Sequence, residues 1–413
     1  MDNVTHSLGG LLLAECAVRL RVRRDGAEPS KRFRAVAAVS SMIAANLPDA
    51  DLFYTGVGGD RLRYMLHHRG YSHTVLAAIA GAMLVYGVAL LVWRWRAREA
   101  PTGLDSRWLL ALLVVSTLSH LVLDWTNSYG VHPFWPFDDR WYYGDSVFIV
   151  EPWLWVVSVP MLVAASRARL VRVLLSLVLL AGVALAWRVD FVSPMAATAL
   201  TIGAALFVAL AVVLRPATRA IAAVAGWLAV TAVMAAGSAT ARQTALSAAR
   251  ESDPGAQVVD IVASPLPANA VCIAVIAVER SGSSYRMSTA RVSAVPSITA
   301  AARCGVRSTV GTIFHPSPRP STRAVQWDSE WSAPIAELAT LARESCPALA
   351  ALRFIRVPVW QSEGAAAVLL GDARYGGGSG TSFSDVRVAR QAPVCPRAMP
   401  PWTPPRAELL DGW

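Results

Sequence analysis

Long stretches without a charged residue constrain the fold of this chain more than any other feature. They occupy residues 74–93, 108–119, 152–166, 173–187, 191–214 and 220–241. A helix needs about 20 residues to cross the hydrocarbon core of a bilayer, with about 17–25 as the usual range. Three of the stretches reach that length, and the others reach it by including a polar or interfacial aromatic residue. The pattern predicts an integral membrane protein, with the lipid bilayer as its partner.

The composition changes after Arg242. The whole chain is 54% hydrophobic and only 16% charged, where a soluble protein has about a quarter of its residues charged. Residues 245–413 contain no long apolar run and are rich in Ser, Pro, Gly and Arg. We therefore expect a mainly α fold with two units: a polytopic helical membrane domain over residues 1–242 and a small β-rich soluble domain over residues 250–413.

Basic residues predict the orientation of the chain. The net charge is +10 and Lys31 is the only lysine, but most of the excess lies in short loops, so topology explains it and a nucleic-acid partner is not expected. Alternate loops carry sixteen and five Arg or Lys residues, and basic loops stay cytoplasmic. With a first helix at 4–20 and a second at about 34–47, this predicts about eight membrane segments, and both the amino terminus and the soluble domain lie outside the cytoplasm.

Cysteine usage is compatible with that placement. Cys16 lies alone in an apolar segment, and the soluble part contains Cys272, Cys304, Cys346 and Cys395. In an oxidising compartment four cysteines allow two disulfides, with three connectivities. The sequence leaves open whether they are disulfides or free thiols.

Histidine and aspartate gather where the predicted helices meet the outer surface. Six of the seven histidines lie in the first 132 residues, and residues 67–73 (HHRGYSH) hold three of them beside the apolar run 74–93. His120 and Asp124 are four residues apart, so they share one helical face. Segments that lie far apart in the chain therefore bring these residues to the same membrane surface: His6, the pair in NLPDAD (Asp49 and Asp51), HHRGYSH, and the His120–Asp124 pair.

These residue types suit a divalent metal. Neutral imidazole and carboxylate are ligands for zinc, manganese or iron, and several carboxylates favour more than one ion. A charge near the middle of a membrane helix costs about 2.5–3.5 kcal/mol, so Asp124 needs a cation or hydrogen-bond partner.

Each of these candidate ligand motifs also has an interpretation that involves no metal. His6 alone is more often a polar residue at a helix start. Pro48 disfavours helix at Leu47, and Asp49 is then a cap. His120 and Asp124 can pair with each other without metal, and HHRG can be an interfacial turn. The joint occurrence favours the metal site.

The motifs DNVTHS, NLPDAD, HHRGYSH, SHLVLDWTNSYGVHPFWPF and FIVEP resemble the YdjM-like bacterial inner-membrane proteins, described as membrane-bound metal-dependent hydrolases. The resemblance is strongest over residues 1–155, and ASPLPAN and GDARYG are similar to longer members. It implies a bacterial inner-membrane protein and a hydrolase-like core with a metal site built from His6, Asp49, Asp51, His68, His73, His120 and Asp124. More distantly, the chain is similar to the helical zinc-dependent phospholipase C group. It departs from the family where an Asp is expected before Pro152, because Glu151 stands there.

Two further residues, Arg69 and Glu151, are candidates for catalysis. Arg69 is the first choice for holding an anion by paired hydrogen bonds, with an interface anchor as its alternative, and Arg140 is the second choice. Glu151 is a candidate ligand or proton carrier, or it simply starts the fifth segment.

The soluble domain carries less chemistry. The stretch AVCIAVIAVERSGSSYRMSTARV predicts a hairpin turning at SGSS, LRFIRVPVW and AAAVLLGDARY predict strands, and PIAELATLARESC predicts a helix. His315 lies in a predicted loop and is expected to be incidental, and GGGSG at 376–380 is expected to be a turn. Asp372 and Arg374 either reach the membrane site or pair within the sheet.

The leading hypothesis is a membrane-bound metal-dependent hydrolase that cleaves a phosphoester or other ester of a lipid or envelope component through metal-activated water. Zinc is the first choice of metal, and one or more ions are compatible with the ligand set. The alternative is a non-enzymatic envelope protein with a structural metal and a partner-binding soluble domain. A transporter is weaker, because the ionisable residues cluster at one surface. The sequence fixes neither the substrate nor the oligomeric state.

Overall fold

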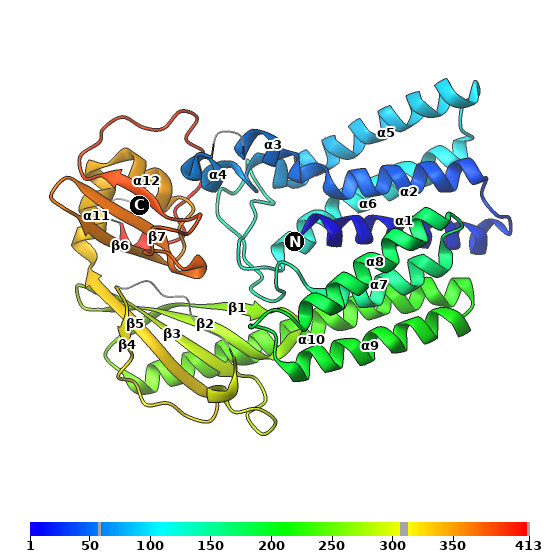
Figure 1. The fold of residues 1–413 in the computed structure, drawn as a ribbon. Helices are drawn as coiled ribbons and strands as arrows, with labels where there is room; N and C mark the ends of the chain where they lie inside the picture. The colour runs from blue at the N-terminus through cyan, green and yellow to red at the C-terminus, as the bar shows by residue number, and fades with distance from the viewer. Residues whose placement is uncertain (57–58, 306–312, 411–413) are drawn as a thin grey trace.

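Long helices form most of the first 252 residues (Figure 1). The computed structural model describes residues 1–56, 59–305 and 313–410. The long helices are α1 (Asn3–Asp25), α2 (Lys31–Asn46), α5 (Val75–Ala97), α6 (Gly103–Trp125), α7 (Pro152–Ala165), α8 (Arg169–Ala186), α9 (Pro194–Val213) and α10 (Pro216–Ser252). Short helices follow α2: η1 (Leu47–Asp51), α3 (Leu52–Thr55), α4 (Arg61–His67) and η2 (Tyr71–His73).

Each long helix falls on one of the predicted segments. Within the described residues, five of them are long and apolar enough to cross a membrane, namely α5, α6, α8, α9 and α10. Large apolar side chains project outward from them, as Leu84 (62% exposed), Leu91 (68%) and Val212 (75%) do, which suits a lipid environment. The helical membrane region is confirmed, while the count of eight spans and the side of each loop stay predictions.

Local sequence explains where the helices begin. The side chains of Ser30, Thr74 and Thr102 each accept a hydrogen bond from a backbone N–H in the first turn of α2, α5 and α6. Such caps satisfy amide groups that lack a partner inside the helix. The cap at Thr74 fixes the point where the polar HHRGYSH segment turns into an apolar helix.

Helix α10 runs through the predicted domain boundary. Its 37 residues span about 55 Å at 1.5 Å per residue, which exceeds the roughly 30 Å hydrocarbon core. Beyond the apolar part, Ala241, Ala245 and Ala249 pack against the sheet of the soluble part. At Gly237 a Cβ atom would lie 2.1 Å from the Ala270 carbonyl oxygen, so only glycine permits this approach. The division at residues 242–250 stays a prediction, and one continuous helix crosses it.

Two antiparallel sheets form the carboxy-terminal part. The first has the order β1-β2-β3-β5-β4 and the second β6-β7-β8. The strands are β1 (Gln257–Leu266), β2 (Asn269–Ser281), β3 (Ser284–Ser293), β4 (His315–Pro316), β5 (Val325–Pro334), β6 (Pro358–Glu363), β7 (Ala367–Asp372) and β8 (Val386–Ala389). The helical elements between and after them are η3 (Ala301–Arg303), α11 (Ile335–Glu344), α12 (Cys346–Leu352), η4 (Ala373–Tyr375) and η5 (Ala407–Leu409).

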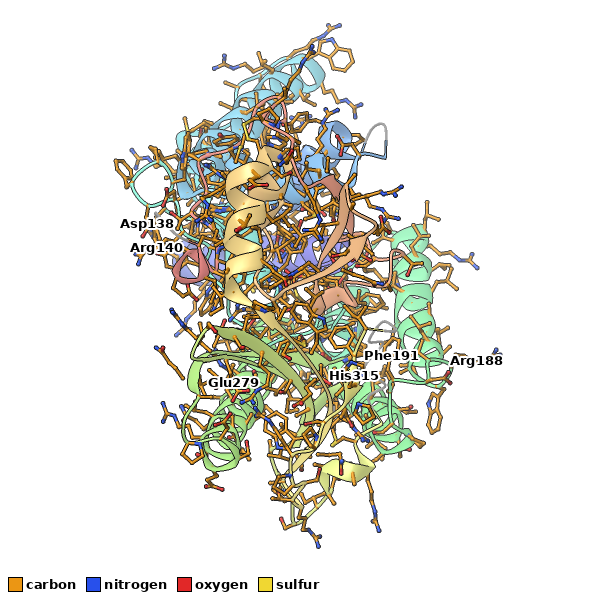
Figure 2. All side chains as sticks on the ribbon, turned by 90° about the vertical axis from the view of Figure 1, so that its left-hand side faces the viewer. Asp138, Arg140, Arg188, Phe191, Glu279 and His315 are labelled. Carbon is orange, nitrogen blue, oxygen red and sulfur yellow. A yellow bond between two sulfur atoms is a disulfide. The ribbon has the colours of Figure 1, made fainter. Side chains whose placement is uncertain are left out.

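The hairpin predicted at SGSS is confirmed, because Ser281 of β2 faces Ser284 of β3. The stretch AAAVLLGDARY contains β7 and PIAELATLARESC contains α11, as predicted. The strand predicted at LRFIRVPVW is wrong over most of its length, because Leu352 ends α12 and β6 begins only at Pro358. The sequence predicts a loop at His315, but this exposed residue, labelled in Figure 2, lies in the two-residue strand β4 opposite Glu330 of β5.

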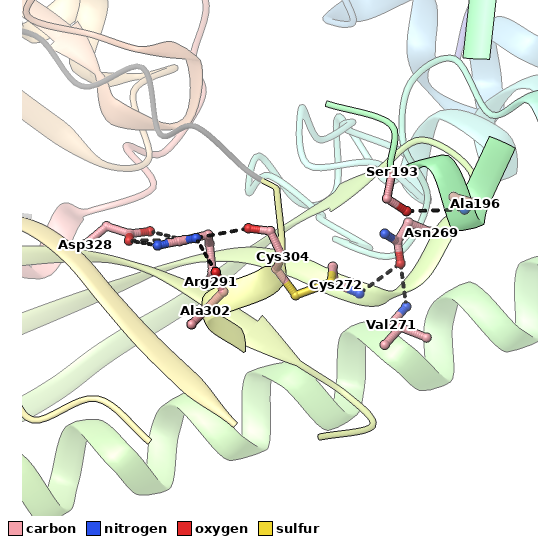
Figure 3. The surroundings of a disulfide bond; sticks show 9 residues. All are labelled: Ser193, Ala196, Asn269, Val271, Cys272, Arg291, Ala302, Cys304 and Asp328. Atoms are coloured by element: carbon pink, nitrogen blue, oxygen red, sulfur yellow. Dashed lines mark hydrogen bonds and ion pairs between the residues drawn. A yellow bond between two sulfur atoms is a disulfide. The ribbon is translucent and has the colours of Figure 1, made fainter. Parts of the chain in front are cut away.

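The four cysteines of the soluble part form two disulfides, Cys272–Cys304 and Cys346–Cys395. Figure 3 shows the first of them, at the start of β2, where Asn269 accepts hydrogen bonds from the amides of Val271 and Cys272. Arg291 donates to the Cys304 carbonyl at 3.1 Å and pairs with Asp328. The question that the sequence left open is thus answered in favour of disulfides.

The carboxy-terminal part covers the end of the bundle from which α1 begins (Figure 1). The indole of Trp402 is buried and donates to the Leu66 carbonyl at 3.0 Å, one residue before HHRGYSH. Arg374 donates to the Ser128 carbonyl at 2.6 Å, just after α6. The soluble part therefore contacts the same segments that carry the predicted metal ligands.

Candidate metal centre

Helices and turns far apart in the chain bring histidine and aspartate side chains to this covered end of the bundle. Pro48 stands at the start of η1, which places the two aspartates of NLPDAD directly after α2. The predicted ligands lie in α1 (His6), η1 (Asp49 and Asp51), the segment from the end of α4 to η2 (His68 and His73) and the last turns of α6 (His120 and Asp124).

Four of these side chains form the centre of the cluster. One donor atom from each of Asp49, His73, His120 and Asp124 lies within 4.8 Å of the others, and all four side chains are buried. His73 Nε2 lies 3.1 Å from Asp124 Oδ2 and 3.4 Å from Asp49 Oδ1. His120 Nε2 lies 3.3 Å and 3.6 Å from the same two oxygens. The atoms converge on one point.

Hydrogen bonds on the far side of each imidazole turn Nε2 toward that point. His120 Nδ1 lies 2.7 Å from the Ala45 carbonyl oxygen, so Nδ1 carries the proton and donates it. His73 Nδ1 lies 2.9 Å from Ser72 Oγ and 3.4 Å from Asp51 Oδ2. A carbonyl or carboxylate behind a histidine is the usual arrangement around protein-bound metals, because it fixes the tautomer and the ring.

The spacing of the donors fits a small cation. Zinc bonds to nitrogen and oxygen are about 2.0–2.2 Å long, so tetrahedral ligands lie about 3.4 Å from one another. The distances from His73 and His120 to the two carboxylates, 3.1–3.6 Å, bracket that value. The two Nε2 atoms are 3.1 Å apart, where two unprotonated nitrogens repel unless a cation or proton lies between them.

The pKa values of the cluster also favour a bound cation. Burial acts to raise the pKa of Asp49, but its hydrogen bond with His73 and the charges of His120 and His73 together outweigh burial and lower the pKa to about 2. Burial acts to lower the pKa of His73, but hydrogen bonds with Asp124, Asp49 and Asp51 raise it to about 10. The carboxylates thus hold a positive charge between them, and metal ions bind such sites in exchange for protons.

A second group, formed by Asp49, Asp51 and His68, shares Asp49 with the first. His68 Nδ1 lies 2.9 Å from Asp51 Oδ1. The other oxygen of Asp51 accepts from the Arg69 amide at 3.0 Å and from Ser72 Oγ at 2.7 Å. Asp51 therefore also holds the HHRGYSH segment in place.

His6 joins the cluster through Asp124. Its Nε2 atom lies 3.2 Å from Asp124 Oδ1, and its ring stacks on His120 with centroids 3.8 Å apart. The α-amino group of Met1 contacts the same carboxylate oxygen. All seven predicted ligands therefore lie in one connected polar cluster, with His6 at its margin.

Arg69 also lies within this cluster. Its side chain is buried, Nη2 lies 3.0 Å from Asp124 Oδ1, and Nη1 donates to Asn127 Oδ1 at 2.9 Å. The backbone of Arg69 has φ of 61°, an uncommon conformation for a non-glycine residue and one that often occurs at functional sites. Arg140 is exposed and pairs with Asp138 in its own loop, as Figure 2 shows at the edge of the molecule.

The structure places Glu151 at the start of α7, outside the histidine–aspartate cluster. One carboxylate oxygen accepts from the Trp153 amide at 3.1 Å, and both accept from the Ala268 amide in the turn after β1. It therefore caps α7, which is the alternative that the sequence offered. Burial raises the pKa of Glu151 to about 8, but its hydrogen bonds link it to the soluble part and not to the cluster.

Comparison of the chain with known protein families gives a match in this region. Residues 1–191 match the YdjM inner membrane protein family over every element that contributes to the cluster. Over these residues the chain is similar to the YdjM inner membrane protein family. No curated protein and no solved structure matches the chain. The more distant similarity to phospholipase C is not among the matches and stays a prediction.

The YdjM-family region contains supporting residues that the sequence analysis left out. His132 is buried, its Nδ1 lies 3.3 Å from the Arg69 carbonyl oxygen, and its ring stacks on Trp402 at 3.8 Å. Asn127 accepts hydrogen bonds from both Arg69 and the Tyr129 amide. The density of histidine in the first 132 residues was the available signal for His132, whereas nothing in the sequence marked Asn127.

Proposed function

We propose that the chain is a membrane-bound metal-dependent hydrolase whose site faces the extracytoplasmic side of the inner membrane. The observation that carries this is the convergence of Asp49, His73, His120 and Asp124 on one point, with spacing that suits a divalent cation. Similarity to the YdjM family supports the membrane setting. The uneven distribution of Arg and Lys among the loops supports the side.

In this proposal the four central residues hold the metal, zinc foremost and manganese or iron as alternatives. His6, Asp51 and His68 complete the site, and the group around Asp51 provides for a second ion. A bound divalent ion supplies the chemistry by lowering the pKa of a coordinated water and polarising an ester. Arg69 binds the anionic part of the substrate, an ester or phosphoester of a lipid or envelope component. Glu151 as a proton carrier is the weakest part, because its hydrogen bonds lead away from the cluster.

Metal analysis of the purified full-length protein tests the centre. We expect about one equivalent or more of zinc, manganese or iron in the wild type and almost none in the double variant His120→Ala/Asp124→Ala. His315→Ala is the control, since His315 is exposed and distant from the cluster in sequence. A wild type purified without metal, and unable to take it up on dialysis, would contradict the site.

The burial of all four central side chains also suits a structural metal in a non-enzymatic envelope protein. Structural sites have closed coordination and catalytic sites keep an open position. Cobalt substitution separates the two: an absorption spectrum that changes on adding azide indicates an open position and the hydrolase. A spectrum that does not change favours the structural role.

A further inference from the structure

Polar atoms beside the metal centre have no hydrogen-bond partner among the described residues. They are buried side-chain atoms of residues that lie on both sides of the contact between the bundle and the soluble part. The atoms are Arg69 Nε, Asn127 Nδ2, Tyr129 Oη and Tyr375 Oη. Leaving a buried donor without an acceptor is unfavourable, so such a group calls for an explanation.

These four residues are neighbours. The Arg69 guanidinium lies over the Tyr129 ring, 4.8 Å from its centroid, and donates to Asn127. The rings of Tyr129 and Tyr375 have centroids 6.1 Å apart. Because Arg69 also lies 3.0 Å from Asp124, the group borders the proposed metal directly.

The unpartnered atoms can all donate a hydrogen bond. Asn127 Oδ1 accepts from Arg69 Nη1 and from the Tyr129 amide, both at 2.9 Å, which assigns the free atom as the amide nitrogen. Tyrosine hydroxyls and a guanidinium N–H are donors as well. Several donors without an acceptor, one of them cationic, match the oxygens of an anion.

A contact of the neighbouring residue Arg374 positions Tyr375 beside this group. Tyr375 ends η4, in which Arg374 pairs with Asp372 and donates to the Ser128 carbonyl at 2.6 Å. That contact holds η4 against the loop that carries Asn127 and Tyr129. Tyr375 lies beyond residues 1–191, so it is an addition to the YdjM-family region.

We propose that Tyr129 and Tyr375, together with Arg69 and Asn127, bind a phosphoryl group of the substrate beside the metal. This inference rests on the proposed function and narrows it to phosphoesters. It also gives the soluble part a place in the site, because Tyr375 is a substrate-binding residue supplied by that part.

The test measures binding to the zinc-loaded full-length protein in detergent by calorimetry. The probes are inorganic phosphate and dioctanoyl phosphatidic acid, and the variants are Tyr129→Phe and Tyr375→Phe, which remove only the hydroxyl. We expect each variant to bind both probes about tenfold more weakly, equal to about 1.4 kcal/mol, with unchanged zinc content. Tighter binding of the lipid assigns a lipid phosphate as the natural ligand, and tighter binding of inorganic phosphate assigns a small phosphoester.

Tyr285→Phe is the matched control. Tyr285 is a buried tyrosine of β3 whose hydroxyl also lacks a partner among the described residues, and it packs against Trp331 and Trp360. Removal of the Tyr285 hydroxyl is expected to leave the affinities for inorganic phosphate and for dioctanoyl phosphatidic acid unchanged. Wild-type affinity in Tyr129→Phe and Tyr375→Phe, or no binding of either probe to the wild type, would overturn the inference while leaving the metal centre intact. A wild type that holds neither zinc, manganese nor iron contradicts the proposed function instead.

Discussion

Two buried polar clusters of this protein differ in how their carboxylates are neutralised. Where the carboxy-terminal part meets the loop before α7, Arg356 pairs with Asp145 and with Asp260, each at 2.9 Å, and Arg406 pairs with Asp260 at 3.0 Å. At the end of the bundle, Asp49 and Asp51 face imidazoles, and Asp124 faces imidazoles together with Arg69. Arginine is always charged, so the first cluster holds permanent cations beside its carboxylates. The imidazoles of the second cluster are charged only when protonated, which leaves Asp49 and Asp51 dependent on a proton or a metal ion.

The comparison teaches how to separate a structural charge network from a site. A network that ties segments together uses guanidinium forks, and here it links Asp145 in the loop before α7 to Arg356 ahead of β6. A cluster of imidazoles and carboxylates retains affinity for a cation. Both kinds are buried, so burial alone does not distinguish them.

The largest expected effect is on the arginine network. Arg356→Ala leaves the buried Asp145 carboxylate without its closest partner, and breaking a buried pair costs about 3–5 kcal/mol. We expect the free energy of unfolding in denaturant to fall by that amount, with metal content unchanged. Arg387→Ala is the control, because Arg387 is 70% exposed and its pair with Glu363 contributes about 0–1 kcal/mol. Loss of metal in Arg356→Ala would show that the arginine network and the metal cluster are not independent.

Removal of metal is expected to have the next largest effect, confined to the bundle cluster. A ligand that binds only the folded state at 100 times its dissociation constant contributes about 2.7 kcal/mol. A chelator should therefore lower the unfolding temperature of the wild type and leave that of Asp49→Asn unchanged. An equal response of the two proteins would show that the cluster does not hold the metal.

The smallest effect concerns pH. Burial acts to raise the pKa of Asp260, but Arg356 and Arg406 outweigh it, so the folded-state pKa lies below the unfolded value of about 3.9. The unfolded state then binds more protons at low pH, and the stabilisation present above about pH 4 is lost as the pH falls. Unfolding temperatures measured from pH 6 to pH 3 should fall more steeply for the wild type than for Asp260→Asn. If the unfolding temperatures of the wild type and Asp260→Asn fell in parallel, Asp260 would not contribute to the stability of the arginine network.

The order of the elements and most of the proposed ligands could be predicted from the sequence. Apolar runs give the helices, because length and hydrophobicity alone decide whether a segment suits a bilayer. The four-residue spacing of His120 and Asp124 defines a shared helical face, and the short NLPDAD and HHRGYSH segments lie next to helix ends. These are local properties of the chain.

Contacts between distant segments were beyond such reasoning. The sequence offers Glu151 as a candidate for catalysis, but it could not predict the hydrogen bond between its carboxylate and the Ala268 amide, 117 residues away. The pairing of the cysteines, the sheet contact at Gly237 and the path of α10 across the composition boundary have the same origin.

The sequence by itself determined that this chain lies in a membrane and carries imidazole and carboxylate donors near the ends of its helices, since both follow from residue type and spacing. Only the tertiary structure decided which donors share one point, and which segment of the carboxy-terminal part meets them. Tyr375 is next to Tyr129 only because Arg374 is held on Ser128. Such proximity depends on the packing of segments some 250 residues apart, which no local pattern encodes.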